Sequence, residues 1–162
     1  MAPRAPLLVL AVGNPSRGDD AIGALLAERL STWLDGEGAA WRDQVEVICD
    51  MQLMVEHVLD LAGRSRVLFI DAAAQGPTPV FCHPVLPSPG APTTSHQCTP
   101  GQLLALHQQV LQAPPPPAML LSVVGSGFEL GGALSGTAHA SLDEAWRLLE
   151  HWLQFNPQEP PP

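Results

Sequence analysis

Basic residues are scarce in this sequence. Its 162 residues include only 7 Lys and Arg against 16 Asp and Glu, which gives a formal net charge of −9. Nucleic acids and anionic membranes attract proteins through basic surfaces, so we expect neither as a partner. The acidic charge suits a basic or metal-loaded partner, and it serves solubility equally well.

Long apolar runs and paired cysteines are also missing. No apolar run approaches the roughly 18 residues of a membrane-spanning helix. The short run at residues 7–12 leads directly into the main motif, so cleavage of a signal peptide there would destroy the first strand. Cys49, Cys82 and Cys98 form an odd set without a C-x-x-C pattern, which favours a reduced protein over a disulfide framework. We therefore expect a cytoplasmic protein.

Several common catalytic and binding motifs are absent. The sequence has no H-E-x-x-H and no G-x-S-x-G, and its glycines at 13, 18 and 23 do not form G-x-G-x-x-G. Two aspartates near those glycines would also repel a phosphate. A Cys–His hydrolase based on Cys98 lacks a supporting signature. Hydrolytic chemistry would therefore need a different set of residues.

The most informative stretch is residues 7–26. It opens with LLVLAV, a short apolar run that predicts a strand buried on both faces. The residues Gly13-Asn14-Pro15 end that strand. From residue 19 to about residue 34, apolar side chains recur at helical spacing. The stretch therefore predicts a strand, a glycine-rich turn and a helix, with two carboxylates where the helix begins.

The two carboxylates have different expected roles. We expect Asp19 to be the helix N-cap, with its side chain accepting hydrogen bonds from free N–H groups of the first turn. One cap uses one carboxylate, so Asp20 is left to point above the sheet. Oxygen ligands at the carboxyl end of a strand suit a cation.

The rest of the chain alternates strands and helices. We predict strands at residues 45–49, 66–71, 79–86 and 118–124, and helices at residues 52–62, 99–112 and from His139 or Ser141 to 153. This alternation predicts a single-domain, three-layer α/β/α fold over residues 1–154, with a twisted, mostly parallel sheet. The strand at 79–86 contains Pro84, so it is predicted to be an antiparallel edge strand. Residues 155–162 are proline-rich and are predicted to form a disordered tail.

The candidate site lies where strands end. Parallel sheets bind ligands outside the carboxyl ends of their strands. Asp20 follows the first strand and Asp71 ends a later one, so both are expected on one rim. His96 lies in a loop from which an imidazole can reach that rim. These three side chains would form a site with open positions, suited to zinc, nickel or iron, with Cys98 as an alternative soft ligand.

The other histidines have more ordinary expected roles. His107 falls on the apolar face of its helix and is expected to be a satisfied core histidine. His57 is expected to be partly exposed on its helix. The remaining ones lie on the edge strand or near helix ends: His83, His139 and His151.

The motif at residues 13–23, GNPSRGDDAIG, resembles the signature of the [NiFe]-hydrogenase maturation endopeptidases. These enzymes remove a C-terminal extension from the precursor of the hydrogenase large subunit once nickel is in place. Three further segments resemble the family: FIDA at 69–72, SHQ at 95–97, and FELG at 128–131 followed by Leu134-Ser135. The similarity covers most of residues 7–153.

The resemblance implies that Asp20, Asp71 and His96 bind metal and carry the catalysis. It implies a monomeric endopeptidase whose partner is the large-subunit precursor, with nickel carried by that substrate. Whether the protein holds a catalytic metal of its own stays open. A competing hypothesis is a nickel-sensing maturation chaperone with the same fold and no proteolytic activity.

The sequence departs from the family pattern at two places. Asp20 stands where some members have Glu, whose side chain is one methylene longer. Residues 50–57, DMQLMVEH, replace a glycine-rich segment. Together with residues 128–130, this segment resembles members that serve soluble NAD-coupled hydrogenases.

Overall fold

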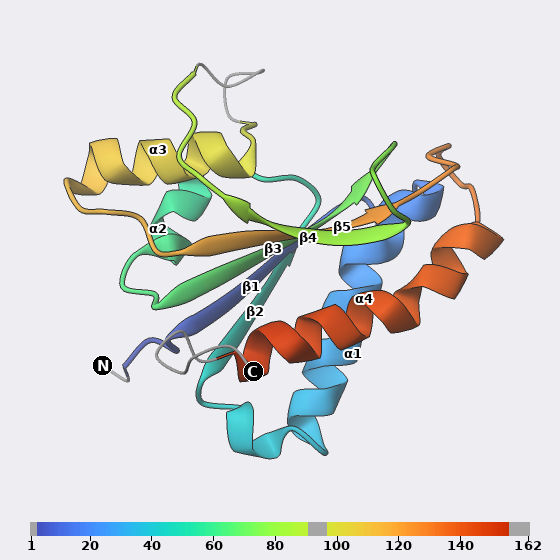
Figure 1. Ribbon diagram of the computed structural model, residues 1–162, viewed down its shortest axis with the longest axis horizontal. Helices are drawn as coiled ribbons and strands as arrows, with labels where there is room; N and C mark the ends of the chain where they lie inside the picture. The colour runs from blue at the N-terminus through green and yellow to red at the C-terminus, as the bar shows by residue number, and fades with distance from the viewer. Residues whose placement is uncertain (1–2, 91–96, 156–162) are drawn as a thin grey trace.

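The chain folds around one five-stranded sheet (Figure 1). The computed structural model describes residues 3–90 and 97–155. The strand order is β2-β1-β3-β5-β4, parallel throughout except for β4, which runs antiparallel to β5. The predicted fold class, with one antiparallel edge strand, is confirmed. The strands are β1 (Leu7–Val12), β2 (Val45–Asp50), β3 (Arg66–Ala73), β4 (Val80–Val85) and β5 (Ala118–Val124).

Helices cover both faces of the sheet. The pair α1 and α4 lies on one face, and the pair α2 and α3 lies on the other (Figure 1). The α-helices are α1 (Ile22–Asp35), α2 (Val58–Leu61), α3 (Pro100–Leu111) and α4 (Gly136–Gln154). Short 3-10 helices are η1 (Gly18–Ala21), η2 (Ala39–Trp41) and η3 (Val55–His57). None of the helices in the described residues is long and apolar enough to cross a membrane.

Strand β1 forms the centre of the core because its six side chains are all buried. Alternate residues contribute to the two layers: Leu7, Val9 and Ala11 to one, and Leu8, Leu10 and Val12 to the other. Burial of an aliphatic side chain contributes roughly 1.5–3 kcal/mol. The strand therefore anchors the turn that follows it, where Asp19 and Asp20 lie.

Two helix predictions need correction. The first α-helix begins at Ile22, after η1, and Asp19 makes no capping hydrogen bond to either helix. The helix predicted at residues 52–62 is wrong for its first three residues, and the next three form a 3-10 helix. Met54 is extended and pairs with Gln97, so helical structure begins only at η3 and continues into the four-residue α2.

The last helix begins earlier than the sequence pattern predicts. Ser135 is its N-cap, and the Ser135 hydroxyl accepts a hydrogen bond from the Ala138 N–H at 3.1 Å. The helix therefore starts at Gly136 rather than near His139. Residues 156–162, most of the predicted tail, lie outside the described residues.

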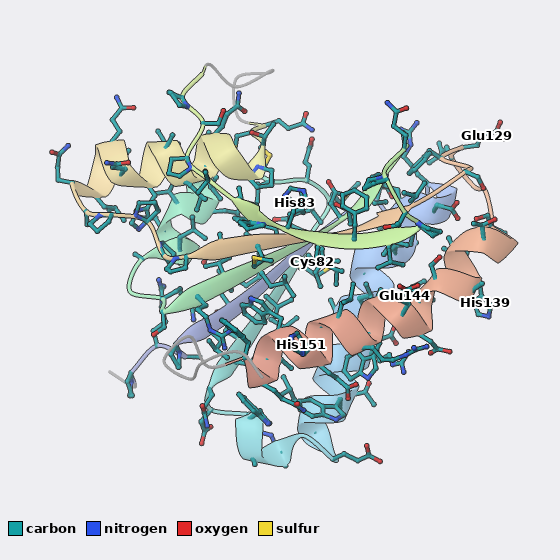
Figure 2. The ribbon with its side chains drawn as sticks, viewed as in Figure 1. Cys82, His83, Glu129, His139, Glu144 and His151 are labelled. Carbon is teal, nitrogen blue, oxygen red and sulfur yellow. The ribbon has the colours of Figure 1, made fainter. Side chains whose placement is uncertain are left out.

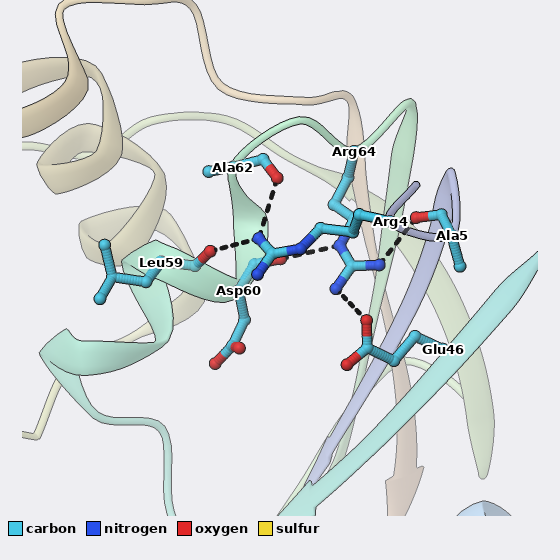
Figure 3. Close-up of polar contacts among 7 residues, drawn as sticks. All are labelled: Arg4, Ala5, Glu46, Leu59, Asp60, Ala62 and Arg64. Carbon is cyan, nitrogen blue, oxygen red and sulfur yellow. Dashed lines mark hydrogen bonds and ion pairs between the residues drawn. The ribbon is translucent and has the colours of Figure 1, made fainter. Parts of the chain in front are cut away.

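Arg64 ties the amino-terminal end of the sheet together (Figure 3). Its buried guanidinium donates to the carbonyls of Asp60 and Ala5 at 2.9 and 2.7 Å, and it pairs with the Glu46 carboxylate. Beside it, Arg4 donates to two carbonyls of the α2 segment. These contacts fix α2 and β2 against the chain that enters β1.

Candidate active site

A cavity of about 520 Å³ opens at the carboxyl ends of the parallel strands. Five stretches that are distant in sequence line it: the turn after β1, the segment after β2, the end of β3, the residues at the start of α3, and Leu120 of β5. Asp20 comes from the first stretch and Asp71 from the third, so both predicted carboxylates face one cavity. The parallel arrangement of β1 and β3 is what places these two ends on one rim.

Asp20 is positioned by the tight turn between β1 and η1. The Asn14 N–H donates to Asp20 Oδ2 at 2.7 Å. Gly13 has a φ of +149°, and a Cβ there would lie 2.0 Å from the Asp20 carbonyl oxygen. Only glycine allows this approach, which brings Asp20 over the end of the strand.

Asp71 lies inside β3, opposite Ser122 of β5. The pKa of Asp71 is raised to about 7: burial raises it most, the charge of Asp20 adds to the rise, and the Ala72 backbone hydrogen bond opposes it. A carboxyl with this pKa is partly protonated near neutral pH. Asp20 and Asp71 together place two carboxyl groups, each able to ligate a metal through oxygen, in one cavity.

The two carboxylates fit a divalent cation. A positive charge between them would offset both effects that hold the Asp71 pKa high, and carboxylate oxygens ligate zinc, nickel and iron in sites of mixed donors. Within residues 3–90 and 97–155, no group of three or more His, Cys, Asp or Glu is arranged to hold a metal. His96, the predicted third ligand, lies outside the described residues, and its neighbour Gln97 lines the cavity.

Solved protein structures share this fold. Hydrogenase maturating endopeptidase HybD from Escherichia coli matches with a TM-score of 0.66 and 21% identity, over 91% of each chain. The chain has the fold of the hydrogenase maturation proteases. The [NiFe] hydrogenase maturation protease HycI from Thermococcus kodakarensis matches with a TM-score of 0.64 and 21% identity, over 92% of this chain and 90% of that one.

A third structure extends the comparison. Hydrogenase 2 maturation peptidase from a Thaumarchaeota archaeon matches with a TM-score of 0.63 and 19% identity, over 95% of this chain and 100% of that chain. No protein-family model and no curated protein sequence matches the chain. At identities of 19–21%, the likeness shows the maturation-protease fold.

Asp19 has a structural position within this maturation-protease fold that the sequence did not indicate. It is fully buried, and its carboxylate accepts from the backbone N–H groups of Ser126, Gly127 and Ser135 and from the Ser135 hydroxyl. Burial alone would raise its pKa, but these hydrogen bonds outweigh burial and lower it. The predicted N-cap is therefore wrong, because the loop before α4 supplies better donors.

Cys98 lines the same cavity and is buried. Burial raises the pKa of its thiol, and the charge of Glu56 adds to the rise. The raised pKa favours the protonated thiol, which disfavours Cys98 as a nucleophile. Its Sγ lies 3.9 Å from the Leu53 carbonyl oxygen.

His57 is buried rather than partly exposed. The Met54 N–H donates to its Nδ1 at 2.9 Å, and its Nε2 lies 3.4 Å from Asp50 Oδ2. This pairing holds the segment after β2, which lines the cavity. Sequence reasoning missed it, because a strand-end aspartate and a histidine seven positions later carry no recognisable motif.

The remaining described histidines lie away from the cavity lining. His107 is buried on α3 as predicted, but its Nδ1 has no hydrogen-bond partner among the described residues, so the ring is not fully satisfied. Burial lowers the pKa of His107, and the Ala113 backbone opposes that shift. His83 lies on β4, while His139 and His151 lie on α4 (Figure 2).

Proposed function

We propose that this protein is a hydrogenase maturation endopeptidase. It would remove the C-terminal extension of the [NiFe]-hydrogenase large-subunit precursor after nickel insertion. The observation that supports this proposal best is the meeting of Asp20 and Asp71 in one cavity of a maturation-protease fold. The protein's acidic charge suits a metal-loaded partner.

The carboxylates supply recognition of the nickel that the precursor carries. Asp20, Asp71 and His96 are the residues proposed to contact it, so processing waits until nickel is present. A metal ion held there would polarise the scissile carbonyl and activate water. When no cation is bound between the two carboxylates, Asp71 has a pKa of about 7, which would suit it to accept a proton from an attacking water and to return it to the leaving amine.

The neighbouring segments shape the substrate groove. Asn14 and Arg17 line the cavity beside Asp20, and Arg17 Nε lies 3.4 Å from the Phe128 carbonyl oxygen. Met51 and Gln52 line it from the side of β2. Because these two belong to the segment that departs from the usual glycine-rich pattern, we propose that the enzyme serves a soluble NAD-coupled hydrogenase. We also propose that it is a cytoplasmic monomer.

The test is cleavage of precursor by the purified protein. Precursor with and without nickel is incubated with the parent, with Asp20→Asn and with Asp71→Asn, and the products are weighed by mass spectrometry. We expect cleavage of the nickel-loaded precursor by the parent alone. Nickel-dependent binding without any cleavage would instead support a maturation chaperone, and absence of both would reject the proposal.

A further inference from the structure

The outer edge of β2 is open. In the sheet order, β2 is an edge strand with β1 as its single partner (Figure 1). The Leu7 N–H donates to the Gln44 carbonyl and the Gly13 N–H donates to the Asp50 carbonyl. In a parallel pair, every second residue of a strand directs its N–H and C=O groups toward the neighbouring strand. The even-numbered residues of β2 therefore bond to β1. The backbone N–H and C=O groups of Val45, Val47 and Cys49 therefore face away from β1; Val45 is buried, whereas Val47 is half-buried and Cys49 is exposed.

These outward groups have no backbone partner in the described part of the chain. Edge strands with free donors and acceptors tend to pair with other chains, and proteins usually block them with proline or charge. The residues of β2 whose backbone groups face outward, Val45, Val47 and Cys49, are neither proline nor charged. The one internal acidic residue, Glu46, is tied to the buried Arg64.

The opposite edge of the sheet is blocked. The Val124 N–H donates to the Pro79 carbonyl, so in the antiparallel pair the even-numbered residues of β4 face outward. One of them is Pro84, which has no N–H to donate. The sheet therefore has one edge without a proline, the outer edge of β2, and its accessible part at Val47 and Cys49 lies next to the candidate site.

The open edge leads directly to the cavity. β2 ends at Asp50, and the following residues Met51 and Gln52 line the cavity. A chain added beside β2 would lie three strand spacings from β3, which carries Asp71. That is about 14 Å at roughly 4.8 Å per spacing, a distance that four or five extended residues cover.

We propose that the precursor binds as an added strand on the outer edge of β2. An extended segment beside the cleavage position would form backbone hydrogen bonds with Val47 and Cys49. The next four or five residues would cross the rim and bring the scissile bond to Asp20 and Asp71. This is the recognition mode in which main-chain bonds supply affinity and the cavity supplies selectivity. The inference rests on the proposed function.

Amide hydrogen exchange tests this inference because it distinguishes the outward N–H groups of β2 from those bonded to β1. Residue-resolved amide hydrogen exchange is measured with and without a synthetic peptide that spans the precursor's cleavage region. We expect exchange at Val47 and Cys49 to slow by roughly tenfold or more when the peptide binds, while Glu46 and Ile48 keep their already slow exchange. Unchanged exchange at Val47 and Cys49 with the peptide bound would overturn the inference.

Pairing of two protein copies is a different outcome of that measurement. It would slow exchange at Val47 and Cys49 without peptide, in proportion to protein concentration. That result would also overturn the inference, because the edge would then be occupied by a second copy of this chain.

A variant pair tests the same point through kinetics. Cys49→Pro removes an outward N–H, and Cys49→Ala keeps it while changing the same exposed side chain. We expect the proline variant to raise KM roughly three- to tenfold over the alanine variant, the value of about one hydrogen bond, with kcat little changed. Equal KM values would overturn the inference. Absence of cleavage by the parent protein would instead reject the proposed function. If the proline variant does not fold, the hydrogen-exchange measurement alone tests the inference.

Discussion

At the scale of the residue, two neighbouring aspartates do different things. Asp19 and Asp20 lie in a 3-10 turn, in which successive side chains are about 120° apart. One carboxylate therefore points into the protein and the other into the cavity. Asp19 holds the loop before α4 by four hydrogen bonds, while Asp20 accepts one from Asn14.

Asp19→Asn is expected to destabilise the fold by about 3 kcal/mol. An amide has one acceptor oxygen, whereas the Asp19 carboxylate has two and accepts four hydrogen bonds, so some of the buried donors would lose their partner. The lowered pKa of Asp19 means that its stabilisation is present above its unfolded pKa and is lost as pH falls below about 4. Urea unfolding at pH 7 measures the loss. Asp20→Asn is the matched control, and an equal loss in both variants would contradict this role for Asp19.

Asp71→Asn is expected to abolish cleavage and to stabilise the fold above neutral pH. The folded state keeps the Asp71 proton up to about pH 7, whereas the unfolded chain releases it near 3.8. Ionised Asp71 therefore costs stability, and that cost grows from about pH 4 to about pH 7 and is constant above. Three pK units set its upper limit at about 4 kcal/mol.

Thermal unfolding at pH 4 and pH 8 checks this prediction. The variant and the parent should have similar melting temperatures at pH 4, with the variant higher at pH 8. A variant that is less stable than the parent at pH 8 would show that Asp71 mainly holds the structure.

At the scale of the element, α3 fixes one wall of the cavity. Thr99 is its N-cap: the Thr99 hydroxyl accepts from the Gln102 N–H at 3.2 Å, and the Gln102 side chain accepts from the Thr99 N–H at 2.9 Å. Pro100 occupies the first helical position, where its missing N–H costs nothing. The capping box therefore sets the entry of the chain that carries Gln97 and Cys98.

Thr99→Ala is expected to cost about 1 kcal/mol of unfolding free energy, since it removes the cap acceptor. It should also weaken precursor binding, because Gln97 and Cys98 lose their fixed position. Chemical denaturation and a binding titration measure the two effects. Thr32→Ala, an exposed position within α1, is the control and should stay within about 0.5 kcal/mol of the parent.

At the scale of the whole molecule, the sheet topology builds the site. Strands β1 and β3 are neighbours although α1 and β2 separate them in sequence, so their carboxyl ends meet on one rim. The residues before α3 then close the cavity from the α2–α3 side. The cavity is therefore assembled from segments that are spread over most of the described chain.

His96→Ala is expected to remove nickel-dependent association with the precursor. An unperturbed histidine has a pKa near 6.5 and binds metal only when neutral, so association of the parent should also weaken below about pH 6. Pull-down of precursor with and without nickel, from pH 5 to pH 8, measures both effects.

His107→Ala is the control for that experiment. It should keep nickel-dependent binding and lose stability through a core defect of about 1–3 kcal/mol. If His96→Ala binds and cleaves like the parent, the third ligand is wrong. Cys98 would then be tested before His83, because Cys98 lines the cavity and His83 does not.

The sequence by itself determined the strands, the fold class and the convergence of Asp20 and Asp71. Strands β1 and β5 begin and end where the apolar runs do, because a strand buried on both faces needs an unbroken run. The Thr99 cap was predictable for a similar reason: a cap is local, and its partner lies three residues away.

Only the tertiary structure decided the role of Asp19, the pKa of Asp71 and the open edge of β2. Asp19 bonds to residues 107 to 116 positions away, and those donors outcompete the helix that follows it. The Asp71 pKa depends on burial by the assembled sheet and on the charge of Asp20. Which strand is left at the edge depends on the order of all five strands. These properties arise from contacts between distant segments, and no local pattern in the sequence encodes them.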